Sequence, residues 1–131
     1  MDKCSNTSIL KYCLLVVSVI FIWGFIKSII GSDFLLTKLG IWDLDVWSIS
    51  HVICYFILTY ICPKKWKFIF VIGVFWELFE QFFGYLPPAL INNLAIQYIP
   101  SDNNNQKWWY GRFSDIICNS LGIMLALHLN K

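Results

Sequence analysis

The most constraining feature of this sequence is an apolar stretch, residues 73–84, that carries two carboxylates. On a 3.6-residue period Gly73, Glu77, Glu80, Gln81 and Gly84 fall on one narrow stripe of a helix. Every other position of the stretch is Phe, Trp, Val or Leu. A carboxylate near the middle of a bilayer costs about 2.5–3.5 kcal/mol on insertion scales, so two on one face require compensating partners.

Composition extends this pattern to the whole chain. Of its 131 residues, 58% are hydrophobic and 14% are charged, whereas a soluble domain carries about 25% charge. The apolar residues gather into four runs, which predict an all-α polytopic membrane protein with four transmembrane helices in a small bundle. We expect a single membrane domain over residues 1–131, and the net charge of +2 gives no indication of a nucleic-acid partner.

The predicted spans are residues 9–30, 46–62, 66–83 and 113–128. The first exceeds the 7–15 residues of a signal-peptide core, so we expect an uncleaved span. Pro87 and Pro88 forbid a continuous helix after the third span. The segment at about 88–110 is therefore predicted to lie at the interface or to form a short lid.

Lysine placement predicts the orientation of these spans. Lys64, Lys65 and Lys67 lie between spans two and three, while the first connection is mainly acidic. The positive-inside rule then places both termini in the cytoplasm. The five cysteines include no Cys-x-x-Cys pair, so we expect packing residues rather than a zinc site or a disulfide framework.

Polar and ionisable residues of three spans fall near the outer surface. At 1.5 Å per residue, His51, Glu77 and Asn119 lie about 7–9 Å deep, and Glu80 and Asp115 about 3–5 Å deep. We therefore predict one shared site. The expected catalytic residues, which are also the expected metal ligands, are His51, Glu77, Glu80 and Asp115. The expected substrate-binding residues are Arg112, Gln81, Asn119 and Ser114.

The charges of this predicted site do not balance. His51 and Arg112 cannot neutralise all three carboxylates, so protonation or a bound cation is implied. Hard oxygen ligands favour a divalent cation such as Mg²⁺ or Ca²⁺, and a histidine beside carboxylates also suits acid–base chemistry. The alternative is that these groups are interhelical hydrogen bonds with a purely structural role.

The order of these residues along the chain resembles the VanZ-like family of small bacterial membrane proteins. The match covers about residues 46–128: His51 in one helix, Glu77 and Gln81 in the next, then Arg112 and the pattern Asp115-x-x-x-Asn119-x-x-Gly122. An aspartate–lysine pair that often precedes the histidine in that family is missing, because residues 46–50 read Val-Trp-Ser-Ile-Ser. The resemblance implies a role in the cell envelope or with lipids.

Three functions stay open from the sequence. The first is a site in the outer leaflet that binds a lipid or envelope-precursor headgroup, with or without a divalent cation and with or without turnover. The second is a proton- or cation-coupled transport subunit, for which four short spans require a homo-oligomer. The third is a structural membrane protein of an envelope or a larger complex.

Overall fold

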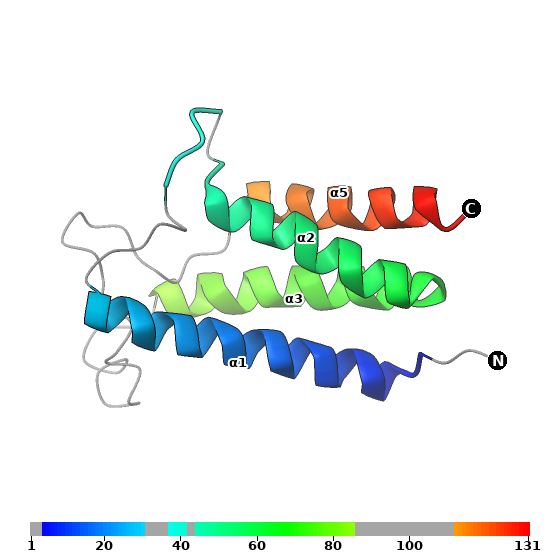
Figure 1. The fold of residues 1–131 in the computed structure, drawn as a ribbon, viewed down its shortest axis with the longest axis horizontal. Helices are drawn as coiled ribbons and strands as arrows, with labels where there is room; N and C mark the ends of the chain where they lie inside the picture. Colours follow the sequence, from blue (N-terminus) through cyan, green and yellow to red (C-terminus); the bar gives the residue numbers. More distant parts are fainter. Residues whose placement is uncertain (1–3, 31–36, 42–43, 86–111) are drawn as a thin grey trace.

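The chain folds into four α-helices in the computed structural model, which describes residues 4–30, 37–41, 44–85 and 112–131 (Figure 1). The helices are α1 (Asn6–Ile30), α2 (Val46–Ile61), α3 (Trp66–Tyr85) and α5 (Phe113–Leu129), with a 3₁₀ turn at Pro63–Lys65. The all-α prediction is confirmed for these residues, and each helix agrees with its predicted bounds to within three residues. The predicted lid at about 88–110 lies outside the described residues.

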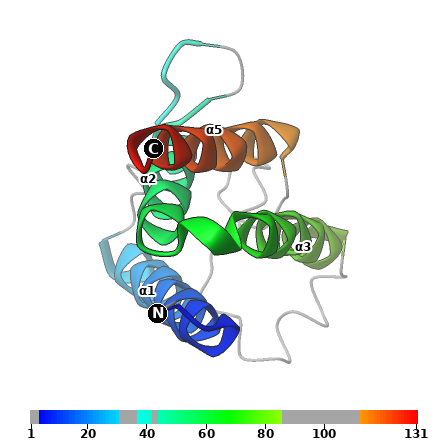
Figure 2. The ribbon, with the colours of Figure 1, turned by 90° about the vertical axis from the view of Figure 1, so that its right-hand side faces the viewer.

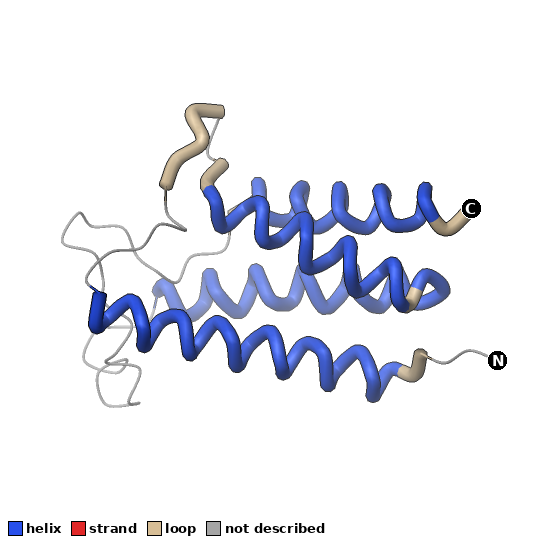
Figure 3. The backbone as a smooth tube through the Cα atoms, in the orientation of Figure 1, coloured by secondary structure: helices blue, strands red, loops and turns tan. Residues whose placement is uncertain are grey.

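The helices lie roughly side by side and alternate in direction (Figure 1). Figure 3 follows the same path as a tube, and the two marked ends of the chain lie at the same end of the bundle. Viewed from that end, α2 lies directly beneath α5, with α3 and α1 on either side below (Figure 2). The opposite end of the bundle therefore holds the start of α2, the end of α3 and the start of α5.

Gly122 explains the close approach of α2 and α5. A Cβ atom at this position would collide with the Val52 carbonyl oxygen and would lie 2.9 Å from the Phe56 amide nitrogen. Only the absence of a side chain allows the two backbones to pack this tightly, as small residues do between membrane helices. The close pairing fixes the beginnings of α2 and α5 against each other.

The start of α2 is determined by a local turn and a cap. Gly40 adopts a φ of 73°, which glycine accepts without strain, and the Val46 amide then donates to the Thr37 carbonyl oxygen. Asp45 is the N-cap: its carboxylate accepts from the Ser48 amide at 2.9 Å, and the Ser48 hydroxyl accepts from the Asp45 amide at 3.4 Å. This reciprocal capping buries an aspartate that the sequence places in a polar connection.

Apolar side chains dominate the outside of α2, α3 and α5, and polar ones the inside. Ile53, Phe75 and Met124 are 52%, 68% and 67% exposed. Ten polar or charged residues are buried in the part of the chain that the structure describes: Asp45, Ser48, His51, Thr59, Glu77, Glu80, Arg112, Ser114, Asp115 and Asn119. This distribution is the reverse of the one expected in water.

Helix length and composition identify fewer membrane-crossing candidates than the four predicted spans. Only α1, over Asn6–Trp23, is long and apolar enough by itself among the described helices. The α2 helix and the segment Pro63–Phe82 meet the criterion only together, with a bend of 114° between them, and α5 is a shorter apolar helix.

The apolar core lies toward the end of the bundle that holds the termini. It contains Ile9, Leu58, Ile69 and Ile123, together with Tyr55 and Cys62. Cys62 forms a disulfide with Cys4, so the expectation that all five cysteines are packing residues is wrong for this pair. Their separation of 58 residues carries no local signal. Cys13, Cys54 and Cys118 are free thiols.

Candidate functional site

The first half of the polar cluster is an ion-pair network between the starts of α2 and α5. The Arg112 guanidinium lies 2.7 Å from the Asp45 carboxylate and 3.2 Å from the Asp115 carboxylate. The Ser48 hydroxyl donates to Asp115 Oδ1 at 3.0 Å, which adds a direct bond between the two helices. Two buried carboxylates therefore share one guanidinium, an arrangement in which each group depends on the others for compensation.

The second half centres on His51. Its Nδ1 lies 2.9 Å from Asn119 Oδ1 and 3.5 Å from Glu77 Oε1. An amide oxygen is only an acceptor, so Nδ1 carries the hydrogen and Nε2 of the neutral ring has the lone pair. Nε2 has no hydrogen-bond partner among the residues that the structure describes. A histidine held at one nitrogen with the other available is the arrangement found in metal-ligating and acid–base histidines.

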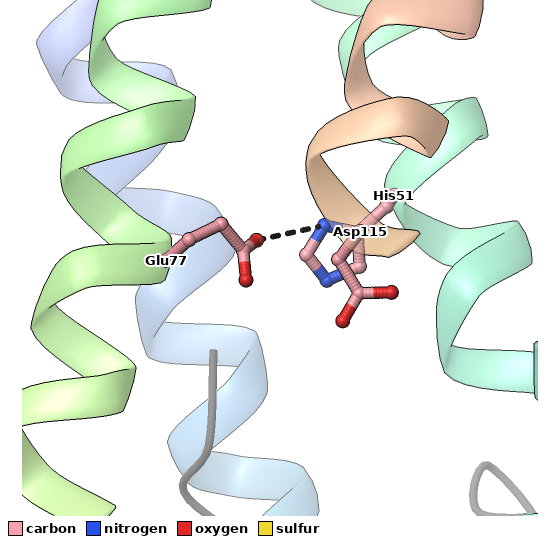
Figure 4. Close-up of side chains that lie close together, drawn as sticks. All are labelled: His51, Glu77 and Asp115. Atoms are coloured by element: carbon pink, nitrogen blue, oxygen red, sulfur yellow. Dashed lines mark ion pairs between the residues drawn. The ribbon is translucent and has the colours of Figure 1, made fainter. Parts of the chain in front are cut away.

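Glu77 connects α3 to the other two helices. Its Oε2 accepts from the Arg112 backbone amide at 3.2 Å, while its buried Oε1 accepts no hydrogen bond. Figure 4 shows His51, Glu77 and Asp115 converging from α2, α3 and α5. One potential ligand atom from each lies within 4.8 Å of the other two, close enough to hold one metal ion. The prediction that polar groups of three helices meet is confirmed for these residues and Asn119.

The remaining predicted residues lie at different distances from this group of three. Glu80 is buried one turn beyond Glu77, and its carboxylate is not part of the group. Gln81 is half-buried and has no hydrogen bond to the cluster among the described contacts. Ser114 is buried, and its hydroxyl has no partner in the described part of the chain. The assigned roles of all these residues stay predictions.

Sequence reasoning missed Asp45 as a member of the cluster. It stands in the connection before α2, where an acidic residue is expected to be solvated. An aspartate directly before an apolar run is a typical N-cap residue, which predicts where α2 begins but not that the carboxylate is buried. Nothing local indicates its ion pair with Arg112, which lies in a distant part of the chain.

The cluster holds more acid than base. The buried carboxylates are Asp45, Glu77, Glu80 and Asp115, and the buried basic groups among the described residues are Arg112 and His51. If all four acids are ionised, two positive charges are missing even when His51 is protonated. Because an uncompensated buried charge is costly, such a site favours a proton or a metal cation. Carboxylate oxygens with one imidazole suit Mg²⁺, Ca²⁺ or Mn²⁺.

Arg112 is less suited to bind an anion than its position alone suggests. Its Nε and one terminal nitrogen already face carboxylates. A phosphate at this guanidinium would have to displace Asp45 or Asp115. The geometry therefore favours a cation as the first ligand of the cluster.

Comparison with known proteins does not assign the chain to a family. No protein-family model matches the chain, and neither a curated protein nor a solved structure shows significant similarity to it. The chemistry of the cluster therefore rests on its own geometry.

Proposed function

We propose that this chain is a multi-span membrane protein whose polar cluster binds a divalent cation and, through it, the phosphate of a lipid or envelope-precursor headgroup. The observation that carries the proposal is the group of three ligand atoms from His51, Glu77 and Asp115 within 4.8 Å of one another. A metal held there has open coordination positions, which phosphate oxygens can fill.

The exterior of the bundle supports the membrane part. Large apolar side chains point outward on three helices while ten polar groups are buried. In hydrocarbon this arrangement is favourable, because buried polar groups find partners inside the bundle and apolar ones face lipid tails. The resemblance of His51, Glu77 and Asp115-x-x-x-Asn119-x-x-Gly122 to VanZ-like proteins supports the same class.

The orientation of the chain is part of the proposal. Lys64, Lys65 and Lys67 lie at the end of the bundle that holds the termini, which favours a cytoplasmic position for both termini and an outer position for the cluster. The disulfide Cys4–Cys62 lies at that same end and favours the opposite orientation, because disulfides persist in oxidising compartments. A phosphatase fused after Lys131 tests the orientation. The enzyme is active only after export, so phosphatase activity would show that the C-terminus lies outside and would contradict the proposed orientation.

Mn²⁺ binding to the purified protein in detergent tests the cation site. Wild type should bind one Mn²⁺ per chain, and Mg²⁺ should compete for it. Glu77→Gln, which removes a ligand of the group of three, should lower the affinity by about tenfold or more. Glu80→Gln is the matched control, since its carboxylate lies outside the group, and it should bind within about threefold of wild type.

Two results would contradict the proposal. If folded wild-type protein binds no Mn²⁺, the cluster is a structural network of interhelical hydrogen bonds and ion pairs and not a cation site. Equal loss in Glu77→Gln and Glu80→Gln would mean that binding is non-specific attraction to acidic charge. The phosphate part of the proposal is tested by adding phosphatidylglycerol or inorganic phosphate to the Mn²⁺-loaded protein. If the ligand is a lipid headgroup, phosphatidylglycerol should bind more tightly than inorganic phosphate.

A further inference from the structure

A narrow apolar groove leads along the bundle to the polar cluster. It has a volume of about 510 Å³, and its walls are residues 12–20 of α1 and 47–61 of α2, with Ile72 and Trp76 of α3. Figure 2 shows α1 beside α2 on the side away from α5. Apart from Ser50 and His51, every lining residue is aliphatic, aromatic or cysteine. The Ser50 hydroxyl donates to the Trp47 carbonyl oxygen, and His51 is the lining residue that belongs to the group of three ligands.

The dimensions of the groove restrict what fits inside it. Residues 47–61 of α2 extend over about 20 Å at 1.5 Å per residue. Its length and its apolar lining suit an unbranched hydrocarbon chain that lies along the helices.

Both ends of the groove are fixed by the fold. Trp47, Ser50 and His51 line the end at the cluster, next to Trp76, which precedes the ligand Glu77. At the other end Ile61 precedes Cys62, whose disulfide with Cys4 holds α1 against α2. The groove therefore runs parallel to the helices from a charged end to an apolar end, as a lipid does in a bilayer.

We propose that this groove holds one acyl chain of a phospholipid whose headgroup lies at the His51 end. The inference rests on the proposed function for the identity of the headgroup site, and it adds the chemical class of the ligand. Van der Waals contact between the acyl chain and the groove walls contributes to the affinity, and the cluster selects the end at which the phosphate lies. Such a pocket lies within the size range of ligand sites, about 300–1,000 Å³.

The test counts bound lipid by native mass spectrometry after adding palmitoyl-oleoyl phosphatidylglycerol to the purified full chain in detergent. Val16→Trp on α1 and Ile57→Trp on α2 each fill the groove. Either variant should weaken lipid binding by about tenfold or more, which displacement of a few methylenes suffices to produce. Leu121→Trp, on the exposed face of α5 and outside the groove, should bind as wild type does.

Mn²⁺ binding in the same samples separates the two proposals. Val16→Trp and Ile57→Trp should keep it, which also shows that they fold. Unchanged lipid binding in both groove variants would overturn the groove proposal while leaving the cation site intact. Groove-dependent lipid binding without any Mn²⁺ binding would support the groove and contradict the proposed function. A dimer that the same substitutions dissociate would assign the groove to a second copy of the chain and overturn the inference.

Discussion

The two ends of this bundle are held together by different forces. The end with the termini has an apolar core around Ile9, Leu58 and Ile69 and is joined by the disulfide Cys4–Cys62. Among the described residues, the opposite end has few buried apolar side chains and is held by ion pairs and hydrogen bonds around Arg112 and His51. Apolar packing tolerates small changes in position, but a buried ionic network depends on every member. This difference supports our proposal that the first end is the scaffold and the second the functional site.

The largest loss of stability is expected from removing the positive charge of Arg112 at the centre of the ion-pair end. Arg112→Met leaves Asp45 and Asp115 buried without their partner, which should cost about 3–5 kcal/mol. The expected result is a marked fall in the thermal unfolding temperature of the purified protein. Lys67→Met, at an exposed position near the other end, is the control and should change stability little. Equal stability of Arg112→Met and wild type would remove the proposed contrast between the ends.

Breaking the covalent link at the scaffold end should have a comparable or slightly smaller effect. Cys4→Ser opens a loop of 58 residues, and loss of such a disulfide from oxidised protein should cost about 2–4 kcal/mol. Mn²⁺ binding should remain, because the ligands lie at the other end. Cys13→Ser, which replaces a free thiol of the adjacent helix α1, is the matched control. Loss of Mn²⁺ binding in folded Cys4→Ser would show that the two ends are not independent.

A smaller loss of stability is expected from a substitution at the contact between α2 and α5. Gly122→Ala places a methyl group against the backbone of α2 at Val52 and Phe56, and overpacking of this kind costs about 1–3 kcal/mol. In Gly73→Ala the new methyl meets only the ring of Tyr55, 2.8 Å away, and that ring can shift. Chemical unfolding should therefore rank Gly122→Ala below Gly73→Ala in stability. The reverse order would mean that α2 and α5 are not closely packed.

Much of the helical framework could be predicted from the sequence because long apolar runs set it. The starts of α2, α3 and α5 at Val46, Trp66 and Phe113 are where the runs begin. The stripe on α3 also predicted correctly that Gly73, Glu77 and Glu80 are buried together. Periodicity shows which residues share one face of a helix, but it does not show which residues of other helices they contact. It could not separate Glu77, which reaches His51, from Glu80, which lies one turn further along the same stripe.

Contacts between distant segments were beyond the reach of the sequence pattern. Asp45 and Arg112 are separated by two helices and their connections, so their ion pair depends on the packing of α2 against α5. Cys4 and Cys62 meet only because α1 returns to the end of α2, and cysteine spacing alone does not determine such a pair. Asp45 is recognisable from the sequence as an N-cap, but that signal does not indicate that its carboxylate joins the cluster.

The most direct test of the cluster is the coordination of a bound metal by His51. Pulsed electron paramagnetic resonance of the Mn²⁺-loaded protein detects the nitrogen of a coordinated imidazole. We predict a nitrogen coupling in wild type that is absent in His51→Ala and retained in His128→Ala, since His128 is exposed at the far end of α5. A coupling that persists in His51→Ala, or bound Mn²⁺ with no nitrogen coupling in wild type, would contradict a metal site at the meeting point of the three helices.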